Sequence, residues 1–213
     1  KGIIPIDCDI DTDQSAEGAM HIEANSDPIN GATVSLAASG ISGLALNGTL
    51  SGNIPGATYP VTGDIIINEG DIATFGPGTK LQFRGEYEFT VNGVLVAEGI
   101  NSSDDGMIVF ENHPDVDTKW RGFTLNNQTE ATSFKYVKIS GAHKTTGGGM
   151  ALNNSSPKID NVIISDNSSL ITAGGIHIAG GTDLVISNST IENNIAGQST
   201  TYGGGGGLWI EET

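Results

Sequence analysis

The second half of the chain repeats itself at a short and nearly constant interval. One ladder of apolar residues follows pairs of glycines in steps of 26 and 32 residues: Met150, Ile176 and Leu208. A second ladder runs in step with the first, in steps of 25 and 27 residues: Ile139, Ile164 and Ile191. Two independent ladders with matching periods predict a repeat architecture, in which each repeat packs on the next.

The content of each repeat identifies the architecture. Every repeat holds two or three short alternating segments separated by Gly, Asn or Ser, which leaves no room for a helix. Three short strands would form one coil, and coils would stack at the ordinary strand spacing of about 4.8 Å. Leucine-rich repeats fit worse because no L-x-x-L-x-L frame recurs, and a β-propeller needs repeats of about 40 residues or more. The sequence therefore predicts an all-β, right-handed parallel β-helix.

The predicted β-helix covers residues 45–213. Residues 1–44 match no repeat. We expect them to form an irregular N-terminal segment that caps the solenoid or is the remnant of a preceding domain, because an open solenoid end must be protected from edge-to-edge pairing. The chain stops at Thr213, just after a new apolar run has begun. We therefore expect a β-helix truncated at its C-terminal end and a chain that is a piece of a longer polypeptide.

Composition and charge narrow the classes of partner. The chain holds 31 Gly and only 16% charged residues, a mixture that disfavours helices and suits short strands and turns. Its 25 acidic residues outnumber 9 Lys and Arg, for a net charge of −16, which argues against nucleic acid as a partner. No apolar run approaches the roughly 20 residues of a membrane span, so membrane insertion is not expected. The lone Cys8 cannot form an intrachain disulfide.

Several segments resemble one large bacterial group. They read YPVTGDI (59–65), GPGTKLQF (76–83), VNGVLVAEG (91–99) and WRGF (120–123). The group is the pectin-lyase-like right-handed parallel β-helix proteins, which are usually large secreted or cell-surface proteins. The Gly-Gly-apolar segments, with ISDN (164–167) and IENN (191–194), are also loosely similar to the repeats of polymorphic outer membrane proteins, which are adhesins. The resemblance implies the fold and an extracellular or cell-surface location.

The resemblance also implies the residue sets that enzymes of this fold require. Polysaccharide lyases need calcium-binding carboxylates and a base that is often Arg, and only Arg84 and Arg121 are available. We expect a structural role in a turn for Arg121. Polygalacturonase-like hydrolases need four short motifs, of which the chain holds only the pair Asp104-Asp105. The histidines form no recognisable nucleophile motif with Ser or Cys: His21, His113, His143 and His177.

Two sets of residues are candidates for binding. Aromatic side chains on an outer face would stack on a sugar or on a partner surface, and the candidates are Trp120, Tyr136, Tyr202 and Trp209. Alternating aspartates near the N-terminus resemble the start of a calcium loop: Asp7, Asp9, Asp11 and Asp13. Calcium is thus the candidate cofactor. Inside the solenoid, Asn167 and Asn194 are expected to stack as a ladder that satisfies turn amides.

We expect a non-catalytic extracellular or cell-surface module with a structural or adhesive role. As part of a larger protein, it would present a flat face to a glycan, to a protein surface, or to copies of itself in a filament or matrix. The alternative is a carbohydrate-active enzyme, either a polysaccharide lyase or a glycoside hydrolase, or a tailspike-type glycan-binding fragment. That alternative requires at least three carboxylates in one groove, and the candidates are Asp160, Asp166, Asp183 and Glu192.

Overall fold

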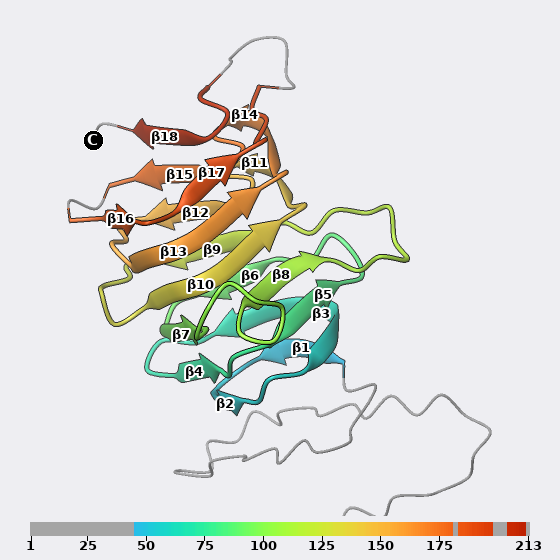
Figure 1. The fold of residues 1–213 in the computed structure, drawn as a ribbon. Helices are drawn as coiled ribbons and strands as arrows, with labels where there is room; N and C mark the ends of the chain where they lie inside the picture. The colour runs from blue at the N-terminus through green and yellow to red at the C-terminus, as the bar shows by residue number, and fades with distance from the viewer. Residues whose placement is uncertain (1–44, 181–182, 198–203, 212–213) are drawn as a thin grey trace, which may run out of the picture.

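The computed structural model describes residues 45–180, 183–197 and 204–211, and within them the chain is a parallel β-solenoid (Figure 1). The described elements are all β-strands, and they pair in parallel. The predicted all-β parallel β-helix is therefore confirmed. The expected N-terminal segment 1–44, with its four aspartates, and Tyr202 lie outside the described residues.

Three stacks of strands form three faces of the solenoid. Face A contains β1 (Leu46–Thr49), the second half of β3 (Thr58–Ile67), β6 (Phe89–Val91), β9 (Phe123–Asn126), β12 (Met150–Asn153), β15 (Ile176–Ala179) and β18 (Leu208–Glu211). Face B contains β2 (Gly52–Ile54), β4 (Ile72–Phe75), β7 (Val94–Glu98), the first halves of β10 (Ser133–Ser140) and β13 (Lys158–Ser165), and β16 (Val185–Ser187). Face C contains the first half of β3, β5 (Lys80–Phe83), β8 (Ile108–Asn112), the second halves of β10 and β13, and β17 (Thr190–Glu192).

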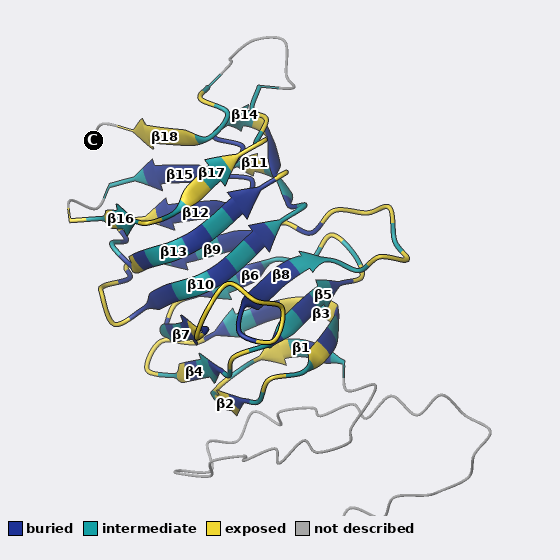
Figure 2. Cartoon of the chain, viewed as in Figure 1, coloured by how far each residue is buried: buried dark blue, intermediate teal, exposed yellow. Residues whose placement is uncertain are grey.

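The strand register confirms both predicted ladders. On face A the first ladder is in register as Met150, Ile176 and Leu208. On face C the second ladder is in register as Ile139, Ile164 and Ile191. Successive side chains of a strand point to opposite sides, so buried and partly exposed positions alternate along the strands of the middle coils (Figure 2).

Residues with a left-handed backbone mark the corners of the later coils. Between faces A and B they are Asn127, Asn154 and Gly180; between faces B and C they are Tyr136, Asn161 and Asn188; after face C they are Gly141, Asp166 and Asn193. Asn, Asp and Gly tolerate a positive φ better than other residues. The recurrence of Asn and Gly in the repeats therefore has a backbone cause at these corners.

An aromatic cluster fills the interior of the middle coils. Phe123 lies at its centre, with ring centroids 4.8 Å from Phe89 and from Phe110, and 5.5 Å from Trp120 and from Phe134. All five side chains are fully buried. Because these rings come from different coils, the cluster joins the stacked repeats through their cores.

The predicted asparagine ladder is also present. Asn167 Nδ2 donates to Asn194 Oδ1 at 3.0 Å and to the carbonyl of Ile139 at 3.1 Å. Asn167 Oδ1 accepts the backbone N–H of Ala142 at 2.9 Å. One coil further on, Asn194 Nδ2 donates to the carbonyl of Ile164 at 2.8 Å. The ladder therefore satisfies backbone groups at the end of face C in successive coils.

The connections from face C to face A differ in length from coil to coil. After β5 the connection is residues 84–88, whereas after β8 it is residues 113–122. The connections after β10 and β13 each contain an extra strand, β11 (His143–Thr146) and β14 (Ser168–Thr172), and these two strands pair with each other. This corner is where the solenoid departs most from its regular repeat.

Candidate functional site

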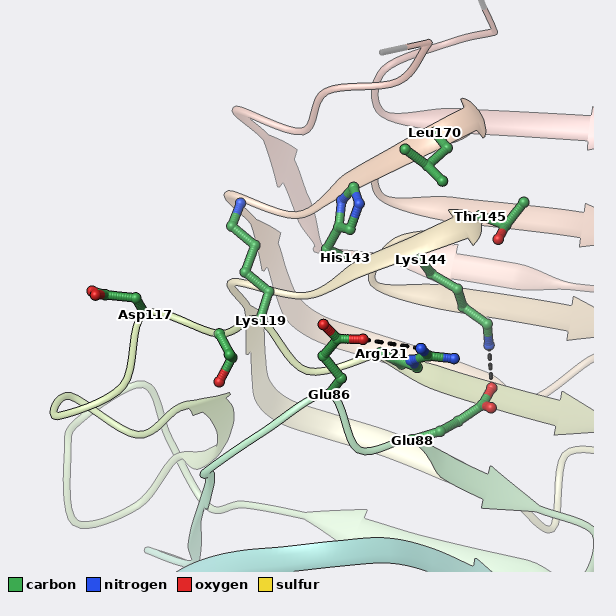
Figure 3. Close-up of a pocket in the computed structure, with 10 residues that line it drawn as sticks. Glu86, Glu88, Asp117, Lys119, Arg121, His143, Lys144, Thr145 and Leu170 are labelled. Atoms are coloured by element: carbon green, nitrogen blue, oxygen red, sulfur yellow. Dashed lines mark hydrogen bonds and ion pairs between the residues drawn. The ribbon is translucent and has the colours of Figure 1, made fainter. Parts of the chain in front are cut away.

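A groove of about 600 Å³ opens where the chain passes from face C to face A (Figure 3). Its lining comes from four consecutive connections, those after β5, β8, β10 and β13. The lining residues are Glu86 and Glu88, residues 117–119, Arg121, residues 143–145, and Leu170. The connections lie beside one another because the strands that flank them are in register. We call this surface the corner groove.

Charged side chains dominate the corner groove. It holds Lys119, Arg121 and Lys144, which are three of the nine Lys and Arg residues of an acidic chain. Arg121 Nη2 donates to Glu86 Oε2 at 3.0 Å, and Lys144 Nζ pairs with Glu88 Oε1 (Figure 3). The hydrogen bond to Glu86 raises the pKa of Arg121. Two of the three cations are thus neutralised within the groove itself.

Thr124 ties one of these ion pairs to face A. Its hydroxyl contacts both Glu88 Oε1 and Lys144 Nζ, and Asp64 Oδ1 accepts the backbone N–H of Glu88 at 2.9 Å. The Lys144 side chain is only 17% exposed and that of Glu88 is 30% exposed. A network of this kind, half shielded from water, holds its donors and acceptors in fixed positions.

A second polar cluster joins the β11 and β14 strands. His143 and Ser168 are opposite each other in register, and His143 Nδ1 lies 2.9 Å from Ser168 Oγ. Lys119 Nζ donates to the same hydroxyl at 3.4 Å. Ser168 is 4% exposed and does not line the groove. Its hydroxyl therefore orients His143 and Lys119, which do line the groove.

Trp120 does not lie on an outer face. Its side chain is fully buried, it stacks on Phe83 with ring centroids 4.2 Å apart, and its Nε1 donates to the carbonyl of Ser140 at 2.9 Å. The prediction of an exposed aromatic is wrong here because burial of this large apolar ring in the core is favourable. The neighbouring Arg121, for which we expected a structural role, pairs with Glu86 and lines the corner groove.

The other described aromatic candidates lie outside the corner groove. Tyr136 is half-buried at a corner, with φ of 49° and with Lys135 Nζ 5.7 Å from its ring centroid. Trp209 is 38% exposed on β18. It shares the outer side of face A with Thr124, three strands away through the register, which is about 14 Å. A ligand that extends from the groove along face A would therefore reach Trp209.

The four carboxylates that the enzyme alternative requires do not share one groove. Asp160 lies on face B. Hydrogen bonds to its carboxylate, of which the one from Asn188 has the largest effect, lower its pKa. Asp166 and Glu192 lie at the far end of face C, and Asp183 precedes β16. Within the described ranges, no group of three or more His, Cys, Asp or Glu side chains is placed to hold a metal ion. The four aspartates near the N-terminus lie outside those ranges.

His177 points outward from face A, as alternation predicts, but it is only 8% exposed. The register places it between Ala151 and Trp209, and a Cβ at Gly147 would lie 2.9 Å from its Cβ. His177 is therefore buried despite its outward position. Burial lowers the pKa of its imidazole, and Glu211, with Oε2 3.6 Å from Nε2, opposes that shift.

We expect the fold to lose stability as the pH falls below about 6.5, the ordinary histidine pKa. Because the pKa of His177 is lower in the folded state, the unfolded chain binds the proton first. The stability that depends on neutral His177 is thus fully present above the unfolded pKa and is lost as the pH falls through the folded pKa. The free energy of unfolding, measured by urea titration at several pH values between about 7.5 and about 5, checks this expectation. His177→Gln should flatten the dependence, and an unchanged slope in that variant would contradict the assignment.

Comparison with family models, with curated proteins and with solved structures finds no significant match. The part of the chain that the structure describes contains no helix long and apolar enough to cross a bilayer. The chemistry of the corner groove is therefore the basis for assigning a function.

Sequence reasoning found the solenoid but not this groove. It singled out Arg121 only as a residue of a turn and His143 only as a histidine outside any nucleophile motif, and it overlooked Glu86, Glu88 and Lys144. No motif joins these residues, because the ion pairs link positions 35 and 56 residues apart. The sequence did contain one signal. Charged residues concentrate in segments that occupy the same position in consecutive repeats.

Proposed function

We propose that the chain is a non-catalytic extracellular or cell-surface module that binds a glycan in the corner groove. The observation that carries this proposal is the internal pairing of the groove's charges, Arg121 with Glu86 and Lys144 with Glu88. Such a surface offers fixed donors beside fixed acceptors, and a sugar hydroxyl both donates and accepts. In this role the solenoid would resemble adhesive members of the pectin-lyase-like bacterial surface proteins.

Binding without cleavage is favoured by the state of the groove's side chains. A lyase base must lose its proton, and the raised pKa of Arg121 opposes that loss. Glu86 and Glu88 each accept a hydrogen bond from a cation, so each is held within the groove's own ion pairs. Ser168, although it contacts His143, is too buried to attack a substrate.

The outer side of face A would extend the binding surface. From the groove, the outward positions run from Thr124 through Ala151 and His177 to Trp209. Beside them Asn92, Asn126 and Asn153 form a ladder of exposed amides linked at 2.9 Å. Amides that line up at the strand spacing, with an exposed aromatic beyond them, suit an extended polysaccharide chain.

A glycan-array screen followed by calorimetry on the best ligand tests the proposal. The double variant Glu88→Gln/Lys144→Met removes an ion pair without leaving one charge alone, and we expect it to weaken binding about tenfold, the loss of one charge-assisted hydrogen bond. The matched control is Lys158→Met, because Lys158 is exposed on face B, away from the groove. It should bind as the unmodified chain does.

Product release is measured on the same samples, as new reducing ends and as unsaturated ends. Retention of glycan without either product is the expected result. Turnover would show that the chain is an enzyme, and equal weakening by Lys158→Met would show that the groove is not the binding site.

A further inference from the structure

One end of the corner groove holds two hydrogen-bond donors, Lys119 and His143, that form no ion pair with a described carboxylate. Lys119 and His143 lie next to each other there, since both contact the hydroxyl of Ser168. Among the described carboxylates, none forms an ion pair with Lys119. Asp117, two residues before it, also lines the groove, but its carboxylate is turned away from Lys119 (Figure 3). This end therefore differs from the rest of the groove, where each cation faces a glutamate.

The Ser168 hydroxyl lies 2.9 Å from His143 Nδ1, and the tautomer of the ring decides which of the two donates. The oxygen accepts from Lys119 Nζ. We take the tautomer in which its single hydrogen goes to the nearer acceptor, His143 Nδ1 at 2.9 Å, rather than to the carbonyl of Ala142 at 3.5 Å. Neutral His143 then carries its own hydrogen on Nε2, so Nε2 is a donor whether or not the ring is protonated. The groove thus ends in an ammonium and an imidazole N–H.

We propose that this end of the groove is a subsite for a tetrahedral oxyanion on the glycan, either a sulfate ester or a phosphate monoester, bound by Lys119 and His143. This inference rests on the proposed function, since it names the substituent that the bound glycan carries. A group with acceptors and no donors matches Lys119, whose ammonium has donors left beside its bond to Ser168, and His143 Nε2, for which the described residues offer no partner. The hydroxyl-binding part of the glycan would lie toward the two ion pairs.

The kind of donor favours a tetrahedral group over a planar carboxylate. A carboxylate is recognised best by the two parallel N–H groups of Arg, but Arg121 already donates to Glu86. Lys119 is a compact charge with three rotatable donors, and His143 adds one donor from another direction. Two separate point donors suit oxygens that project in several directions.

The first experiment uses inorganic ions, which report on the subsite without any sugar. Imidazole ¹H–¹⁵N spectra of His143 are recorded while sodium sulfate, sodium phosphate or sodium acetate is added at matched ionic strength. We expect a saturable shift with sulfate and phosphate that Lys119→Gln abolishes and the face B control Lys158→Gln preserves. An equal response to acetate, or a response that Lys119→Gln leaves unchanged, would overturn the subsite.

The second experiment uses one sugar backbone with different substituents: dextran, carboxymethyl dextran and dextran sulfate. At equal charge density and salt, we expect dextran sulfate to bind at least about tenfold more tightly than carboxymethyl dextran, and Lys119→Gln to remove the difference. Glycan binding that depends on Glu88 and Lys144 but shows no preference for sulfate overturns the subsite alone. Failure of every glycan to bind overturns the proposed function as well.

Discussion

Phe123→Ala is expected to destabilise the fold by about 3–5 kcal/mol, the range for removing a large buried aromatic side chain. Phe123 is fully buried, and its ring contacts aromatic rings from face A, from face B, from face C and from a connection: Phe89, Phe134, Phe110 and Trp120. The truncation would leave a cavity where neighbouring coils meet. Urea unfolding, followed by the fluorescence of the buried Trp120, measures the loss.

A matched control separates this effect from the general loss of an apolar side chain. Ile72 lies on β4 and is 55% exposed, so Ile72→Ala should change the free energy of unfolding by no more than about 0.5 kcal/mol. Phe123→Leu fills part of the cavity and should lie between the two. If Phe123→Ala costs no more than Ile72→Ala, the aromatic cluster does not hold the coils together.

The stack of coils could be predicted because its physical cause is periodic. Strand pairing places residues one repeat apart in contact. The spacing of Ile139, Ile164 and Ile191 in the sequence therefore identifies which residues pair in the structure. The same holds for the buried asparagines, Asn167 and Asn194, whose side chains meet one coil apart. Where each repeat obeys the same rule, the sequence alone predicts both the partner and the register.

Trp120 and Tyr136 show where local rules fail. The segment around Trp120 has the composition of a turn, which says nothing about Phe83, 37 residues earlier, on which its ring stacks. Tyr136 occupies a corner with a positive φ, at the phase where later coils use Asn161 and Asn188. A bulky residue is unfavourable in that backbone region, so tertiary packing overrides propensity there. Neither placement follows from the residues alone.

The corner groove could not be predicted because it is built from the irregular parts of consecutive repeats. The connection after β5 is shorter than those after β8, β10 and β13, and only the last two contain an extra strand, so their side chains have no common period. The pairing of Lys144 with Glu88 depends on the stacking of the coils, which carries two unrelated loops to one corner. Loops on a rigid scaffold are a common place for binding sites, and here the solenoid is that scaffold.

Asn167→Ala is expected to destabilise the fold by about 3 kcal/mol, because it leaves buried backbone groups without partners at about 1–3 kcal/mol each. Asn167 is 1% exposed. Its amide accepts the N–H of Ala142 and donates to the carbonyl of Ile139 and to Asn194. Water cannot reach this position to replace those bonds. Chemical unfolding of the variant measures the loss.

Two further substitutions decide whether the hydrogen bonds or the packing of Asn167 matter. Asn167→Asp keeps the shape and the acceptor for Ala142, but it replaces the donor with a charge beside the carbonyl of Ile139. It should be at least as destabilising as the alanine variant at neutral pH. Asn194→Ala removes the bond to the carbonyl of Ile164 and the acceptor of Asn167, at a partly exposed position. Water can reach the Asn194 side of these bonds, so the variant should cost less than Asn167→Ala, about 1 kcal/mol. If Asn167→Asp lowers the free energy of unfolding only slightly while Asn167→Ala lowers it strongly, the side chain acts by filling space and the ladder of amides is incidental.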